Sequence, residues 1–299
     1  DVQHQKWTVG NLIQYREKVE SFGLNLDMVQ LPLSSADIDT RVKNGEFYNI
    51  LTGTSPERDY EIERICEIIS MCSDAGIPAV KYNLNIIGIP RTKSEFGRGG
   101  AKLSTFRWDE ADKNAPDTYA GKVSEDVFWE RIDYFLDKVV PVAEEKKVRL
   151  ACHPHDPYTP PGYKGVTRVL GTVEGLKKFI SIRENEYHGL NFCQGTITEM
   201  MDNPGEEIFD VIRYFGNKNK IFNVHFRNIK GNKLSFTEVF PDEGSINMYE
   251  AIKVYKEVNY KYMLMPDHVP QINAKDPKMT AFSYCYGYIN ALLQSIENV

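Results

Sequence analysis

The chain lacks any long apolar run and any excess of positive charge. No stretch of about 18 consecutive apolar residues occurs, which excludes a membrane-spanning helix. The 36 lysines and arginines are outnumbered by 42 aspartates and glutamates. The formal net charge of −6 therefore argues against nucleic acid as a partner, since nucleic acid calls for a basic surface. No signal peptide is visible, although the chain opens on Asp1 rather than Met.

Cysteine is scarce and forms no recognisable framework. The five cysteines include no C-x-x-C pair; they are Cys66, Cys72, Cys152, Cys193 and Cys285. This pattern predicts a reducing compartment, the cytoplasm, with one thiol kept for chemistry. Sequence repeats and low-complexity tracts are also absent. The composition that remains, 41% hydrophobic and 26% charged residues, is typical of a soluble globular protein with a large core.

Four short apolar runs each end on a residue that can bind a metal ion. The runs VRLACH, GLNFC, IFNVH and YMLMPD end on His153, Cys193, His225 and Asp267. Their intervals are 193−153 = 40, 225−193 = 32 and 267−225 = 42 residues, each suited to one strand-helix-strand unit. Because the carboxyl ends of barrel strands carry the active site, these four side chains are predicted to converge. Singly, each has an ordinary structural alternative, such as a buried cysteine.

Two further apolar runs, at 24–30 and 79–84, bring the predicted strands to six. Amphipathic or capped helices are predicted between and around them, at 7–22, 56–75, 127–147, 173–184, 204–216, 247–258 and 280–297. This alternation predicts an α/β fold, a TIM (β/α)8 barrel forming a single catalytic domain over residues 1–299. A closed barrel needs eight strands. We therefore expect that the first two strands are missing from this sequence, or that the barrel is open on that side.

Two imidazoles, a thiolate and a carboxylate form a strong site for a divalent cation. Donor softness alone favours Zn2+ or Fe2+, because Mn2+ rarely takes sulfur. A catalytic metal would keep positions open for substrate oxygens. It would then act as a Lewis acid while a neighbouring C–H proton leaves.

Further polar residues follow these strand ends. His268 comes directly after the fourth ligand and is the best candidate for proton transfer, because imidazole titrates near neutral pH. Arg227 lies two residues beyond His225 and so can share its inward direction, and we predict that it is a catalytic residue. His155, in the Pro- and Gly-rich loop after the first ligand, and Asn228 also lie close in sequence to the ligands and are predicted, with Arg91, to bind the substrate. Tyr284 is a candidate second acid, with packing in an aromatic helix as the equal alternative.

A long connection at 85–123 is predicted to form a lid over the same face. Its Arg91 and Lys93 could pair with an anionic substrate, since an arginine fork suits a carboxylate. GRGG in this connection lacks the Lys-Ser/Thr ending of a phosphate loop. Asp242 and Glu243 either approach the substrate or cap the helix that follows.

Five short motifs, HPHDP, NFCQGT, HFRN, FPDEG and PDHVP, occur in an order that resembles the mannonate dehydratase family. The similarity extends through YN…RT at 82–92 and the C-terminal helix. It implies a xylose-isomerase-like TIM barrel whose first two strands precede Asp1. It further implies that D-mannonate loses water to give 2-keto-3-deoxy-D-gluconate in hexuronate breakdown. Mn2+ would be held by His153, Cys193, His225 and Asp267, with Fe2+, Co2+ and Zn2+ as alternatives. Acid-base chemistry would fall to His268 and a tyrosine placed at Tyr284.

The chain also departs from this family pattern. HPHDP replaces the usual HPDDP, so His155 stands where the family has an acid, and Ile89 and Pro90 replace Trp-Thr. A dehydratase for another aldonic acid, or a sugar or sugar-acid isomerase or epimerase, is therefore the competing interpretation. A non-catalytic sugar-acid binding protein would instead have a saturated metal site. The expected partner is a small sugar acid, with no nucleic acid and no membrane, and a homo-oligomer is left open.

Overall fold

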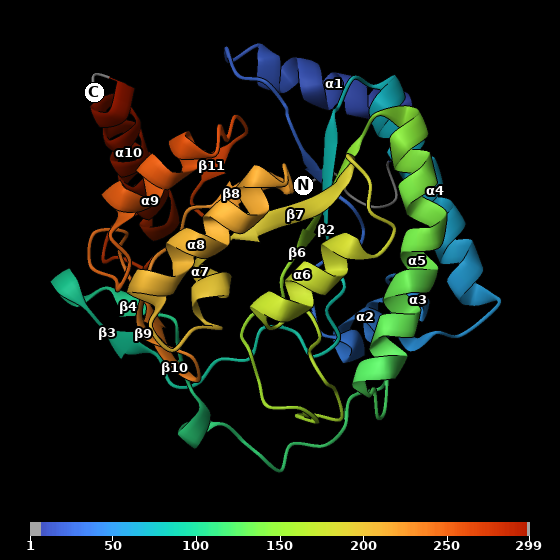
Figure 1. The fold of residues 1–299 in the computed structure, drawn as a ribbon, viewed down its shortest axis with the longest axis horizontal. Coiled ribbons are helices and arrows are strands. Elements are labelled where there is room, and N and C mark those ends of the chain that lie inside the picture. The colour runs from blue at the N-terminus through green and yellow to red at the C-terminus, as the bar shows by residue number, and fades with distance from the viewer. Residues whose placement is uncertain (1–6, 298–299) are drawn as a thin grey trace.

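The centre of the molecule is a parallel sheet of six strands (Figure 1). The computed structural model describes residues 7–297. The strands are β1 (Val29–Gln30), β2 (Ala79–Asn83), β6 (Arg149–His153), β7 (His188–Cys193), β8 (Ile221–His225) and β11 (Leu264–Met265). They are adjacent in chain order, and each neighbouring pair is parallel. Each overlaps one of the six predicted apolar runs, so those strand positions are confirmed.

Helices join the strands and cover the outer face of the sheet (Figure 1). The longer ones are α1 (Val9–Glu20), α4 (Glu57–Asp74), α5 (Glu125–Lys146), α6 (Val173–Ser181), α8 (Pro204–Asn217), α9 (Met248–Glu257) and α10 (Pro277–Glu297). In α5 the Ser124 hydroxyl caps the first turn by accepting from Val127 N at 3.4 Å. None of the described helices has both the length and the apolar character that crossing a bilayer requires.

The sheet is curled and remains open within the described residues. β1 and β11 are its two edges, so residues 7–297 form a half-barrel and no closed eight-stranded barrel. This agrees with the prediction of a barrel that is open on one side. The alternative, that two further strands precede Asp1, stays a prediction.

Smaller elements lie beyond the carboxyl ends of the strands. The connection at 85–123 is more ordered than a simple loop: it contains β3 (Glu95–Phe96), β4 (Lys102–Leu103), β5 (Thr105–Arg107), η2 (Arg98–Gly100) and η3 (Trp108–Glu110). β5 pairs with β10 (Ser235–Glu238), and β10 pairs with β9 (Ile229–Asn232). The β5-β10-β9 sheet links the long connection to the segment after β8. The remaining helices are short: α2 (Ile38–Asn44), α3 (Asn49–Thr52) and α7 (Gln194–Thr198).

Strand register sets the levels at which inward side chains lie. Asn83 is paired with His153, and Cys193 with His225, so β2 and β6 end level with each other, as do β7 and β8. Between these two pairs the register is staggered, because Cys152 lies opposite Leu190. Side chains alternate along a strand, so the residue two positions before each strand end faces the same side. These residues include Lys81 on β2, Asn191 on β7 and Asn223 on β8. Polar side chains therefore lie below the strand ends on the inner face of the sheet.

Candidate metal centre

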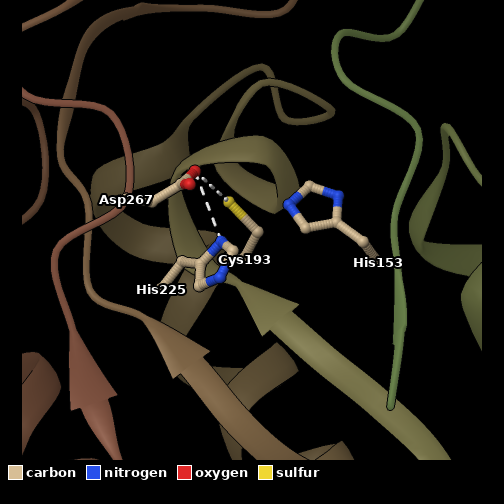
Figure 2. Close-up of side chains that lie close together, drawn as sticks. All are labelled: His153, Cys193, His225 and Asp267. Carbon is tan, nitrogen blue, oxygen red and sulfur yellow. Dashed lines mark hydrogen bonds and ion pairs between the residues drawn. The ribbon is translucent and has the colours of Figure 1, made fainter. Parts of the chain in front are cut away.

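The four predicted ligands meet at the carboxyl end of the sheet. His153, Cys193, His225 and Asp267 each offer one donor atom, and these atoms all lie within 4.8 Å of one another. Figure 2 shows the four side chains pointing toward a common point from separate strands and the loop after β11. Cys193 and His225 are buried, whereas His153 and Asp267 are half-buried at the mouth. The predicted convergence of these strand ends is present.

His153 is held with one ring nitrogen directed at the cluster. Its Nδ1 lies 2.6 Å from the carbonyl oxygen of Pro154, an acceptor, so Nδ1 carries the proton and donates. The lone pair is therefore on Nε2. Burial lowers the pKa of His153 to about 4, which keeps the imidazole neutral near pH 7. A neutral ring fixed by a carbonyl is the usual arrangement of a histidine ligand.

His225 has the complementary arrangement. Its Nε2 lies 3.2 Å from Asn191 Nδ2, within a buried pair in which Asn223 also bonds Asn191. Its Nδ1 is buried and has no hydrogen-bond partner among the described residues, although it lies 3.3 Å from Asp267 Oδ2. The side-chain amides of Asn191 and Asn223 can each be turned over, which exchanges oxygen and nitrogen. In the arrangement as drawn, Asn223 Oδ1 has no hydrogen-bond partner among the described residues. In the turned arrangement Asn191 Oδ1 accepts from His225 Nε2–H, and the Asn191 amino group faces Asn223 Oδ1. That orientation leaves the Nδ1 lone pair free for a cation.

Cys193 ends β7 and caps the short helix α7. Its Sγ is approached by Thr196 Oγ1 at 3.1 Å, Thr196 N at 3.5 Å and Arg227 Nη2 at 3.6 Å. Such donors favour a negatively charged sulfur. The close approach of Arg227 requires Gly195, because a Cβ there would lie 2.2 Å from Arg227 Nε. The NFCQGT motif therefore positions both the sulfur and the arginine behind it.

Asp267 completes the set from the loop after β11. Burial alone would raise the pKa of this carboxyl, but His225, His268 and Arg227 lower it well below its usual value. Asp267 is therefore an anion at neutral pH. Its Oδ2 accepts a hydrogen bond from Cys193 Sγ at 3.7 Å, so the thiol and the carboxylate are held together.

The donor set fits a divalent cation. Two imidazole nitrogens, one sulfur and one carboxylate converge, and the buried Nδ1 of His225 has no hydrogen-bond partner within residues 7–297. A divalent cation bound here would take the place of the thiol proton, because metal binding requires the deprotonated sulfur. The four side chains could therefore hold one such ion, in agreement with the ligand set predicted from the strand ends.

A dense network of ion pairs lies beside the cluster. Arg227, predicted as a catalytic residue, is buried and bonds three carboxylates: Asp156 at 3.0 Å, Glu199 at 3.0 Å and Glu238 at 2.8 Å. Arg91 from the long connection bonds Asp156 at 2.6 Å and also pairs with Glu238. The two arginines thus share Asp156 and Glu238, and the network ties the long connection to the strand ends.

Asp156, Glu238 and His268 also place donor atoms within 4.8 Å of one another. Burial would raise the pKa of Glu238, but Arg227 and Arg91 lower it to about 2. The same two arginines hold the pKa of Asp156 well below its usual value despite burial. Because these carboxylates are already neutralised by guanidinium groups, we assign this group to the ion-pair network and not to a second metal site.

His268 joins this network through one nitrogen and faces the cluster with the other. Its Nδ1 lies 3.0 Å from Glu238 Oε2, and its Nε2 lies 4.0 Å from Asp267 Oδ2. Burial would lower the pKa of His268, but Glu238 raises it. The ring is therefore oriented by Glu238 with Nε2 toward the cluster.

A cavity of about 70 Å3 opens in front of these groups. Its lining includes three of the four predicted ligands, His268 and Asp156, together with polar side chains of the neighbouring strands and loops: Gln30, Ser35, Lys81, Asn83 and Asn85. The cluster is therefore accessible from a polar cavity.

Two predicted substrate residues are directed elsewhere. His155 is buried, and its Nε2 donates to Leu84 O at 2.9 Å while Nδ1 accepts from Leu170 N at 3.3 Å. Asn228 bonds the backbone of Pro241, Ile229 and Ile246, which fixes the segment after β8. Both side chains use their polar atoms on backbone groups, so we do not retain either as a substrate contact.

Tyr284 and its neighbours form a separate group at the surface. The Tyr284 hydroxyl donates to Asp242 Oδ1 at 2.8 Å, and its side chain is 40% exposed. Arg98 pairs with Asp242 at 2.7 Å and with Glu243 at 3.3 Å, which occupies both acidic residues. Lys93 is exposed. Tyr284 is not among the residues that line the metal-cluster cavity.

Sequence reasoning missed the carboxylates of the network. Glu238 ends β10, and Glu199 follows α7; both are buried against Arg227. Burial and the neighbouring Asp156 raise the pKa of Glu199 well above its usual value. The available signal was Glu238 itself, an acid at the end of the short run SFTE, whose last three residues are buried.

Known structures share this fold. The crystal structure of mannonate dehydratase from Streptococcus suis serotype 2 has a TM-score of 0.81 and 24% identity, covering 97% of this chain and 81% of that one. A xylose isomerase domain protein from Planctomyces limnophilus has a TM-score of 0.61 and 13% identity over 99% of this chain and 87% of that one. Fold and residue cluster together define an α/β protein that has a curled parallel sheet, similar in fold to these structures, and a candidate metal centre.

Sequence comparison identifies the family. Residues 103–299 match the profile of D-mannonate dehydratase (UxuA), which spans more than half of the chain. The chain belongs to this family of hydro-lyases. Mannonate dehydratase of Thermotoga petrophila is 28% identical over 88% of this chain and 78% of its own length. The Streptococcus pneumoniae mannonate dehydratase is 25% identical over 97% and 83%.

Proposed function

We propose that this protein removes water from D-mannonate to give 2-keto-3-deoxy-D-gluconate, using Mn2+ held by His153, Cys193, His225 and Asp267. The observation that carries this proposal is the convergence of those four donors beside an open polar cavity in a chain of the D-mannonate dehydratase family. Fe2+, Co2+ and Zn2+ are the alternative ions. We place the reaction in hexuronate breakdown in the cytoplasm.

The bound cation would supply Lewis acidity, making the C2 proton of the acid easier to remove. The residues around it supply geometry and proton transfer. Glu238 holds Nδ1 of His268, so Nε2 is the atom that exchanges a proton with the substrate. Arg227 keeps Glu238, Asp156 and the Cys193 sulfur in fixed relative positions. Tyr284, an expected partner of His268, points to Asp242, and we assign the proton transfer to His268.

A product assay tests this function. Purified protein loaded with Mn2+ is incubated with D-mannonate and with a small panel of other aldonic acids, and the 2-keto-3-deoxy acid is measured. We expect this product from D-mannonate at a rate well above those of the other acids. Removal of the metal by a chelator should abolish it, and added Mn2+ should restore it.

The competing proposal is a sugar or sugar-acid isomerase or epimerase. A D-tagatose 3-epimerase-like protein shares the fold with a TM-score of 0.55 and 17% identity. An isomerase would move a proton without releasing water. A new sugar acid or ketose of unchanged mass would therefore favour this alternative, whereas loss of one water supports the dehydratase.

A further inference from the structure

Lys81 lies on the inner face of the sheet, one level below Asn83 and beside the strand that carries His153. It precedes Asn83 by two residues on β2, and Asn83 is paired with His153. Alternation therefore directs Lys81 to the same side as His153, one level lower. The Lys81 side chain lines the cavity of about 70 Å3 beside the cluster. It also lines an adjoining cavity of about 160 Å3 with Gln30 and Asn223.

Lys81 differs from the other cations near the site because it has no counterion. Arg91 and Arg227 are each bound to buried carboxylates. Within residues 7–297, Lys81 makes no side-chain hydrogen bond and no ion pair. A half-buried ammonium group directed into a cavity is ready to bind an anion.

The charge of the site shows why such a cation would be useful. A divalent ion bound by a thiolate, a carboxylate and two neutral imidazoles has a net charge of zero. A neutral sugar could bind there without further compensation. A sugar acid brings one additional negative charge into a partly buried site, where an unpaired charge is costly. Lys81 supplies one positive charge on the wall of that same cavity.

We propose that Lys81 binds the carboxylate of the substrate and so makes the site selective for sugar acids over neutral sugars. This inference rests on the proposed function, because it assumes an anionic sugar acid as the ligand. In this proposal β2 contributes a residue that binds the substrate, in addition to the four candidate metal ligands and the arginine network. Lys81 is a specificity residue in this proposal and takes no part in proton transfer.

The test compares Lys81→Met and Lys81→Arg with Lys230→Met. Lys230 is an exposed lysine on β9 and serves as the matched control. All proteins are loaded with Mn2+ and assayed with D-mannonate, and manganese content is measured. We expect Lys81→Met to raise KM about 10- to 100-fold, the worth of one charged hydrogen bond, with kcat changed much less. Lys81→Arg should recover most of the loss, and Lys230→Met should match the wild type.

Direct binding separates this inference from the proposed function. Calorimetry with the Mn2+-loaded proteins measures binding of D-mannonate and of neutral D-mannitol. Loss of D-mannonate affinity in Lys81→Met with unchanged D-mannitol binding supports the inference, even when the wild type forms no dehydration product. Equal D-mannonate affinity and KM in Lys81→Met and wild type would overturn it while leaving the dehydratase intact. Loss of manganese from Lys81→Met would also overturn it, because Lys81 would then support the metal site.

Discussion

The two ends of strand β8 carry cavities of very different character. At the amino end, Ile221 and Phe222 help to line a cavity of about 680 Å3 together with Lys218 and Lys220. At the carboxyl end, His225 lines a cavity of only about 70 Å3. Among the described residues, two groups of side chains could hold a metal ion: His153, Cys193, His225 and Asp267, and Asp156, Glu238 and His268. The larger cavity is lined by no member of either group, whereas the smaller cavity is lined by members of both. The cluster of metal-binding side chains, and not the cavity volume, therefore marks the candidate functional end of this sheet, the same end that carries the active site in closed parallel barrels.

The largest expected effect is at the carboxyl end. Replacing Cys193 or His225 by Ala removes one of four metal ligands, so bound manganese should fall from about one ion per chain to near zero. Turnover of D-mannonate should become undetectable. Metal analysis after dialysis measures the first effect. Lys218→Ala, in the larger cavity, should leave the manganese content and the turnover unchanged. A similar loss of manganese and turnover in this variant would contradict the assignment of the function to the carboxyl end of the sheet.

The next effect concerns proton transfer without metal binding. His268→Asn should keep the metal content of the wild type and lower kcat about 100-fold or more, the usual contribution of a general acid or base. Steady-state kinetics combined with metal analysis separates the two quantities. Wild-type turnover in this variant would remove His268 from the mechanism.

A smaller effect is expected one layer below the ligands. Asn191→Leu removes the amide beside His225 Nε2, so the ring loses the partner that fixes its orientation. We expect the manganese dissociation constant to rise about 10- to 100-fold, as for other residues that support metal-binding histidines. Competition with a fluorescent chelator measures it. An unchanged dissociation constant would show that packing alone orients His225.

The smallest effect is expected at the surface group. Tyr284→Phe removes a hydroxyl that donates to Asp242, on a side chain that lies outside the metal-cluster cavity. Turnover of D-mannonate should change by less than about 3-fold, well below the contribution of a general acid. A 100-fold loss of kcat with unchanged metal content would instead return Tyr284 to the role expected from the sequence.

The sequence was sufficient to predict that the candidate ligands lie together, because three of the four end regular strands. Residues at the carboxyl ends of parallel strands must share one edge of the sheet, so His153, Cys193 and His225 could be placed together without coordinates. The same reasoning fails beyond the strand end. β6 stops at His153, so alternation no longer predicts which of His155 and Asp156 faces the cavity; the structure places Asp156 there and buries His155.

Other features depend on contacts that are distant in sequence. Glu238 reaches the site because β10 pairs with β5, a strand within the long connection that was predicted only to form a lid. Tyr284 could have been placed correctly, since Ala281, Cys285 and Ile289 at four-residue spacing are the buried face of α10. Lys81 could also have been noted from its two-residue spacing to Asn83.

Anomalous diffraction at the manganese edge, from crystals grown with Mn2+ and D-mannonate, tests the central claim most directly. We predict one manganese peak within about 2.5 Å of the donor atoms of His153, Cys193, His225 and Asp267, with the sugar acid in the remaining coordination positions. A peak elsewhere in the molecule, or an ion whose coordination is completed without the acid, would contradict the account.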